Sequence, residues 1–269
     1  MRTAFCPNAD LRQYVEAFVS ESGALGTSVP GIAHTTPSLR FDFKGRLKIR
    51  KRRTGAVEQE PPALLIGTHT YRRVDIWYDG DVDSFSIRFQ PAGLYRLFAI
   101  PATELLNCSC DARTVLGPLV SDLQDALAQA SSAQARVLLA EKVLMRQVAR
   151  STVNDRNSRL ISSISARCEN RSVRTLAIDA VISERQLQRT FVANIGLAPK
   201  TFARITRFRA ALSEKLRNPG EQWTDVAHNF GYCDQSHLLR DFRDFASTSP
   251  SHLVAEFQKV PASMCPQPL

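Results

Sequence analysis

The sequence lacks most features that mark secreted, membrane-bound or metal-dependent proteins. Its six cysteines form no CxxC pair and no regular spacing, which argues against a disulfide framework or a zinc-ribbon site. The five histidines are scattered without metal-ligand spacing. No apolar run reaches the length of a membrane-spanning helix, and the opening MRTAFCPNADLRQYV holds no signal-peptide core. We therefore expect a cytoplasmic protein with no metal, no other cofactor and no membrane partner.

Lysine is also scarce. It occurs at only seven positions, so arginine supplies most of the positive charge in a chain of 269 residues with a net charge of +9. Arginine binds phosphates and guanine edges bidentately, so this composition is compatible with a nucleic-acid partner. A GC-rich genome would produce the same bias, and composition alone leaves both readings open.

The first half of the chain has the alternation of apolar and polar residues typical of β-strands. Strands are predicted at 39–43, 46–50, 63–67, 74–78 and 84–89, with turns at 44–45 and 79–81. Leucines and valines at helical spacing follow between residues 116 and 148. We therefore predict an α+β chain whose N-terminal domain, residues 1–150, is a cupin-like sandwich or barrel plus helices.

Aromatic residues of these strands are candidate walls of an effector pocket, with plain hydrophobic core as the alternative. They are Phe41, Phe43, Trp77, Tyr78, Phe85 and Phe89. A cupin-like metal enzyme would need several converging ligands, but only His34 and His69 are available and they form no HxH pair. No GxSxG, P-loop or GxGxxG-plus-acid arrangement occurs either, so we expect no enzyme.

The C-terminal part repeats itself. LAIDAVISERQLQRTF, from residue 176, matches VAHNFGYCDQSHLLRDF, from residue 226, with one extra residue at the turn of the second copy. Each copy has a short helix, a turn, a capping residue (Ser183 or Asp234) and a helix with apolar residues four apart. This pattern predicts two helix-turn-helix units in an all-α domain. Residues 199–218 carry one apolar stripe, which predicts a long helix joining the units.

The polar face of each second helix is predicted to read double-stranded DNA. Arginine and glutamine pair bidentately with guanine and adenine, and capped helix N-termini offer N–H groups to phosphates. The candidate base-reading residues are Arg185, Gln188 and Arg189 in the first unit and Gln235, Ser236, His237 and Arg240 in the second. The candidate phosphate contacts are Ser183, Lys200 and Thr201. The alternative is a protein-interaction module of the same shape, which would show a flat salt dependence of any DNA binding.

Residues 157–257 resemble the AraC/XylS family of bacterial transcriptional regulators. The resemblance rests on LAIDAVISERQLQRTFVANIGLAPKTF and on VAHNFGYCDQSHLLRDFRDFASTSPSHL. It implies a DNA-binding domain, placed at 159–258. The polar run STVNDRNSR predicts a linker before it, at 151–158, and the ending PASMCPQPL predicts a flexible tail at 259–269. The N-terminal part more loosely resembles domains attached to a subset of these regulators, through LRQYVEAFV and QPAGLYRLFAIPATELLN. That resemblance implies a sensing or dimerising role. The further partners expected of such a regulator are a small-molecule effector, a second copy of the chain and RNA polymerase, with association to the nucleoid when DNA is bound.

Three positions depart from the family's usual pattern. Val181 and Ser247 stand where members usually have glycine, and Trp223 replaces a smaller apolar residue. A β-branched residue at the first turn would resist a positive φ at a cost of about 1–2 kcal/mol, or else the turn is built differently.

Overall fold

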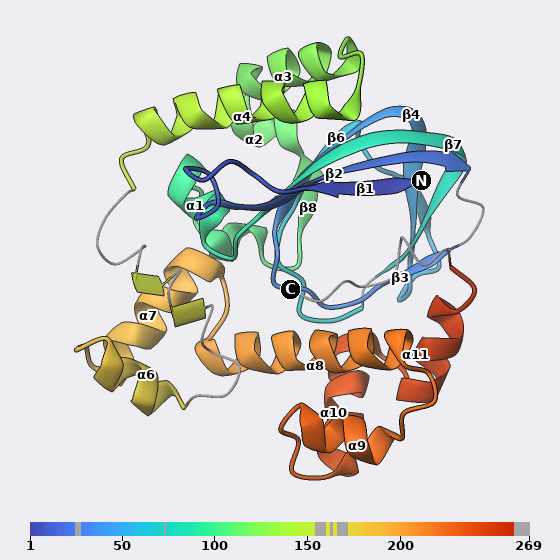
Figure 1. Ribbon diagram of the computed structural model, residues 1–269, viewed down its shortest axis with the longest axis vertical. Coiled ribbons are helices and arrows are strands. Elements are labelled where there is room, and N and C mark those ends of the chain that lie inside the picture. The colour runs from blue at the N-terminus through green and yellow to red at the C-terminus, as the bar shows by residue number, and fades with distance from the viewer. Residues whose placement is uncertain (25–27, 73, 154–159, 162–163, 166–171, 261–269) are drawn as a thin grey trace.

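The computed structural model describes the chain apart from residues 25–27, 73, 154–159, 162–163, 166–171 and 261–269. A strand-rich N-terminal part precedes a helical C-terminal part, which confirms the predicted α+β class (Figure 1). The predicted linker and tail lie mostly outside the described residues.

An eight-stranded antiparallel sheet forms the body of the N-terminal part. Its strands run in the order β1-β2-β7-β4-β6-β8, while β3 pairs with β7 and β5 pairs with β4. Their bounds are β1 Arg2–Phe5, β2 Val15–Ala24, β3 Val29–Gly31, β4 Ser38–Lys51, β5 Val57–Gln59, β6 Ala63–Ile66, β7 Val74–Phe89 and β8 Ser109–Asp111.

Two predicted turns are wrong, because the chain continues through them as strand. The segments predicted at 39–43 and 46–50 form the single strand β4, and those at 74–78 and 84–89 form the single strand β7. Gly45 and Gly80 have φ angles of 73° and 82°, so each glycine introduces a bulge where a hairpin was expected. The register between β4 and β7 shifts on both sides of Lys44. The two bulges face each other closely, since a Cβ on Gly45 would lie 2.5 Å from the carbonyl oxygen of Asp81.

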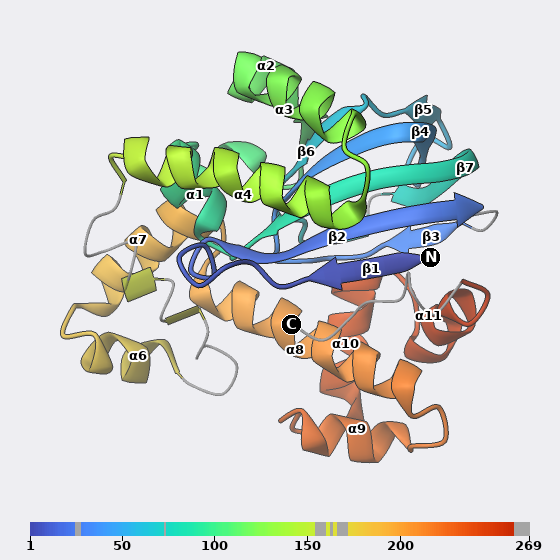
Figure 2. The same cartoon turned by 45° about the horizontal axis from the view of Figure 1, so that its top comes forward.

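The two faces of the bent sheet meet different partners. Helices α2, α3 and α4 cover one face, while α8 (Pro199–Arg217) and α10 (Gln235–Ala246) lie on the other side (Figures 1 and 2). The helices of the N-terminal part are α1 Gly93–Phe98, η1 Ala102–Leu105, α2 Ala112–Leu116, α3 Pro118–Ala128 and α4 Ala133–Arg150. Alternate residues of β4 and β7, such as Phe41, Phe85 and Phe89, pack into the core beneath α3 and α4.

The C-terminal part contains the predicted long helix between two pairs of helices. The bounds are α6 Val173–Asp179, α7 Glu184–Ile195, α8 Pro199–Arg217, α9 Trp223–Asn229, α10 Gln235–Ala246 and α11 Pro250–Phe257. Its hydrophobic core also includes Ile32, Ala33 and Ala92 from the strand-rich part. The core of the C-terminal part therefore extends into the strand-rich part, which also has a separate core of its own beneath α3 and α4. Among the described residues, no helix is both long and apolar enough to cross a membrane.

Candidate nucleic-acid interface

The first unit consists of α6, a tight turn and α7. Ser183 accepts a hydrogen bond from the Gln186 amide at 3.1 Å and so caps α7, as predicted. Leu187 and Phe191 are fully buried, while Arg185, Gln188 and Arg189 are exposed. Three of the candidate base-reading side chains therefore share a solvent-facing side of one capped helix.

The turn of this unit is strained. Val181 has a φ of 56° and its side chain is exposed. The matching residue of the second unit is Gly231, at a φ of 68°. Both turns close with the same backbone hydrogen bond, from Val181 N to Ile178 O at 3.0 Å and from Gly231 N to His228 O at 3.1 Å. The valine therefore does not change the geometry of the turn. Of the two possibilities, a strained positive φ or a turn built differently, the structure has the strained positive φ.

The second unit consists of α9, a turn and α10. Asp234 caps α10 by accepting a hydrogen bond from the His237 amide at 2.7 Å. Gln235, Ser236 and Arg240 are exposed, whereas the side chain of His237 is half-buried. At the end of α10, Ser247 adopts a φ of 55°, the left-handed conformation that the usual glycine would provide.

Helix α8 holds both units. Its apolar stripe meets α7 through Phe202, whose ring lies 5.5 Å from that of Phe191. It meets α10 through Phe208, whose ring lies 4.9 Å from that of Phe242. Trp223, the third departure from the family pattern, packs edge-on against Phe242 at 5.4 Å. The units are thus held by interlocking aromatic contacts rather than by a flexible connection.

The three candidate phosphate contacts differ in side-chain exposure and in whether they already form a hydrogen bond. Ser183 already uses its hydroxyl oxygen to cap α7. Lys200 is exposed in the first turn of α8, and Thr201 beside it is half-buried. Of the three, Lys200 alone has a charged side chain, and it is exposed.

A polar network joins α10 to α8, and the sequence interpretation missed it. Asp241 of α10 is fully buried and accepts two hydrogen bonds from Arg204 of α8, at 2.9 and 2.7 Å. Arg207, also of α8, stacks over the Tyr232 ring at 4.5 Å. Burial, together with the nearby Asp241 charge, raises the pKa of Tyr232. The available clue was an acid within the apolar positions Leu238, Phe242 and Phe245.

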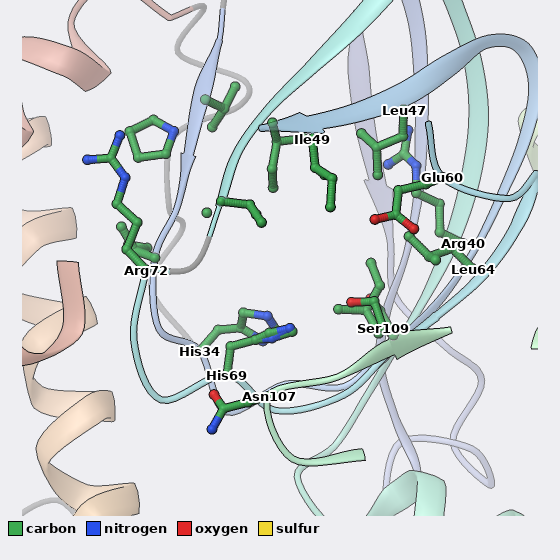
Figure 3. A pocket seen from close by; sticks show the side chains of 18 of the residues that line it. His34, Arg40, Leu47, Ile49, Glu60, Leu64, His69, Arg72, Asn107 and Ser109 are labelled. Carbon is green, nitrogen blue, oxygen red and sulfur yellow. The ribbon is translucent and has the colours of Figure 1, made fainter. Parts of the chain in front are cut away.

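A large cavity lies between the sheet and the C-terminal helices. Its volume is about 1330 Å³, and Figure 3 shows the side chains that converge on it. Leu47, Ile49 and Leu64 line one part, and His34 and His69 line another. Arg209 of α8, Ser247 and Phe257 complete the wall from the C-terminal part. The cavity is therefore built from both parts of the chain.

None of the six aromatic residues expected to form a pocket lines this cavity. Phe41, Phe85 and Phe89 are fully buried in the core on the other face of the sheet, and Phe43 packs against that core. Tyr78 is buried under the Arg40 guanidinium, and Trp77 lies beside that of Arg50. The strand alternation that places the phenylalanines in the helix-covered core turns their neighbours toward the cavity.

Arg209 places a half-buried cation in the cavity wall, and Glu16 is the acid that acts on it electrostatically. No ion pair between described residues involves Arg209, whose Nη1 donates to the Ala33 carbonyl at 3.3 Å and whose buried Nε has no partner among them. Burial and the neighbouring Arg88 lower the pKa of Arg209 to about 10, so it stays charged at neutral pH. His34 and His69 stack at 5.1 Å nearby, and burial, with His69, lowers the pKa of His34 well below its usual value.

Specific contacts fasten the C-terminal helices to the sheet. The Ala33 amide donates to the Phe245 carbonyl of α10 at 3.0 Å. Arg72 is buried and forms two hydrogen bonds with Glu256 of α11, at 2.7 and 3.0 Å. The chain after α7 approaches η1 so closely that a Cβ on Gly196 would lie 2.7 Å from the Ala102 carbonyl oxygen.

Comparison with known proteins agrees with this architecture. Residues 176–256 match the family model of a helix-turn-helix domain, which spans both units and α8. Residues 3–111 match the family model of a domain of unknown function. A search of the curated proteins found no match for the chain.

Solved structures of similar architecture cover most of the chain at low identity. ToxT from Vibrio cholerae O395 is 11% identical, with 90% of this chain and 99% of that chain covered and a TM-score of 0.48. Unsaturated fatty acid bound ToxT from Vibrio cholerae strain SCE256 is 12% identical, with coverages of 90% and 96% and a TM-score of 0.49. The AraC-like transcriptional activator CuxR is 13% identical, with coverages of 71% and 79% and a TM-score of 0.25.

Proposed function

We propose that this chain, a transcription regulator with an AraC-type helix-turn-helix domain, recognises a specific sequence of double-stranded DNA with both of its units. The observation that supports this most directly is the repeated exposure of arginine and glutamine on two capped helices, α7 and α10, held by one rigid helix. Such helices fit the major groove, and half-sites one helical turn apart, about 34 Å, suit two units on one DNA face.

In this proposal the two classes of contact have separate roles. Arg185, Gln188 and Arg189 read bases from α7, and Gln235, Ser236, His237 and Arg240 read bases from α10. Lys200 contacts phosphate, which fixes the position of the protein without selecting a sequence. We keep residues 1–150 as the sensing or dimerising domain and 159–258 as the DNA-binding domain. Contacts with a second copy and with RNA polymerase in the bacterial cytoplasm remain predictions.

The two roles can be separated by mutation. Arg189→Ala is expected to weaken binding to the cognate site by about 1–3 kcal/mol and to relax preference at one base position. Lys200→Ala is expected to weaken binding to cognate and scrambled duplexes alike and to reduce the salt dependence. The cognate site comes first from selection of genomic fragments by the purified full-length protein. Equal losses of Arg189→Ala on both duplexes would exclude a base-reading role.

The cavity supports a second element of the proposal, a small-molecule effector. Arg209 supplies a half-buried positive charge that forms no ion pair with a described residue, although the Glu16 carboxylate acts on it electrostatically. Leu47, Ile49 and Ile66 supply an apolar wall. An anion with an apolar body fits this combination, because it would hydrogen-bond the half-buried guanidinium and cover the apolar wall. Titration calorimetry with aliphatic carboxylates of increasing chain length tests it. Arg209→Met should abolish binding, whereas Arg53→Met, at an exposed basic residue of the wall, should not.

A further inference from the structure

Asp241 occupies a position in α10 that a non-polar residue would be expected to fill. It is fully buried and lies in the same stripe as Leu238, Phe242 and Phe245, all of them buried. A carboxylate at such a place destabilises the fold unless it is paired and hydrogen-bonded. Its presence in α10 therefore calls for an explanation in terms of its partners.

The partners of Asp241 are two arginines of α8. Arg204 donates through Nε and Nη2 to the Oδ1 atom, at 2.9 and 2.7 Å. Arg207 approaches the other oxygen, with Nη2 at 3.6 Å from Oδ2. Hydrophobic contacts are non-directional, whereas charged hydrogen bonds have directional geometry. The carboxylate thus fixes the rotation of α10 about its axis relative to α8.

The network reaches one of the candidate base-reading residues. Arg207 stacks over Tyr232, and its Nη2 lies 3.5 Å from Nε2 of His237. The Tyr232 and His237 rings also meet edge to face at 5.2 Å. A guanidinium can only donate, so the tautomer of His237 that suits this contact accepts at Nε2 and carries its proton on Nδ1. His237 would therefore offer DNA a donor of fixed direction.

Among the described residues, no ion pair like that of Asp241 joins α7 of the first unit to α8. By the alignment of the two repeats, Thr190 stands where the second unit has Asp241. No ion pair between described residues joins α7 to α8, and their contact includes the ring pair Phe191–Phe202. The two recognition helices are thus held differently: α7 by apolar packing and α10 by packing plus a buried charge.

We propose that Asp241 is a positioning residue that sets the orientation of α10 and His237, so that its charge governs base preference in the second half-site alone. This inference rests on the proposed function, since it requires that α10 reads DNA. It adds a specificity determinant that does not itself touch DNA.

The test is selection of bound duplexes from a randomised library by the wild-type protein, Asp241→Asn and Asp244→Asn. Asp244 is the matched control, because it contacts the same Arg204 at 2.6 Å but its side chain is 47% exposed. We expect Asp241→Asn to reduce base discrimination in the second half-site roughly tenfold and to leave the first half-site unchanged. Asp244→Asn should select the wild-type motif.

A second variant covers the case in which Asp241→Asn does not fold. In Arg204→Met/Asp241→Leu the ion pair is replaced by apolar side chains of similar size, a change that buried ion pairs often tolerate. The inference is overturned if either folded variant selects the wild-type second half-site, or if both half-sites lose discrimination equally. A wild-type protein that selects no motif would instead refute the proposed function.

Discussion

Replacing Val181 by glycine is expected to stabilise the protein. Val181 has a φ of 56°, and its side chain is 90% exposed, so its removal sacrifices almost no buried surface. Left-handed backbone costs an L-residue about 1–2 kcal/mol. Glycine gives back about 0.4–1 kcal/mol of this through the greater freedom of the unfolded chain. The net gain in unfolding free energy is then about 0.5–1 kcal/mol, or roughly 1–4 °C in Tm for a chain of this size.

The measurement is thermal unfolding by circular dichroism of Val181→Gly beside two matched variants. Val181→Ala keeps a Cβ and so keeps most of the strain, and it should gain less than glycine. Gly231→Val places the same valine at a φ of 68° in the second unit and should lose about what Val181→Gly gains. If Val181→Gly melts no higher than Val181→Ala and Gly231→Val melts like the wild type, the strain argument fails for both turns.

The remaining predictions concern the junction between the two parts. Gly196→Ala should lower the unfolding free energy by at least about 1–2 kcal/mol, because φ is 82° and the new Cβ would meet Ala102 at 2.7 Å. Urea titration measures this change. Gly55→Ala, at a φ of 71° with open space around it, should lower the unfolding free energy by less, and equal losses in the two variants would exclude the clash with Ala102 as the cause. Because the pKa of His34 is lowered on folding, the folded state binds fewer protons, and stability present above about pH 6.5 should fall as the pH drops through that value. In His34→Phe the unfolding free energy should depend less on pH between pH 7 and 5. An unchanged pH profile would contradict a role of His34 in this loss of stability.

Local patterns were sufficient to predict the helical part. The caps Ser183 and Asp234, and the four-residue spacing of Leu187 and Phe191, depend on interactions within one or two helical turns. Only the family resemblance drew attention to Val181, because members usually have glycine there. No local sequence pattern predicts a positive φ at an exposed valine. The candidate base-reading roles of these helices remain predictions.

The sheet was harder to predict, because bulges and turns share the same residues. The sequence predicted turns at Lys44–Gly45 and at Gly80. Each instead lies inside a long strand, β4 or β7, at the point where the paired strand also bulges. Strand β2 was missed altogether, since VEAFVSESGA alternates weakly and pairs with β7 from far along the chain. Asp241 and Arg209 gain their meaning only from residues on other elements, which no local pattern contains.

The arrangement also determines how an effector could act. Ala33 receives the Arg209 hydrogen bond at its carbonyl and donates its amide to Phe245 at the end of α10. A ligand that draws the Arg209 guanidinium away from Ala33 therefore perturbs the same residue that anchors the second unit. The first unit meets the N-terminal part at Ala102, which does not line the cavity. A ligand shifts the equilibrium between two conformations only if it binds them with different affinities. We therefore expect an effector in this cavity to change the position of α10 strongly and that of α7 only weakly.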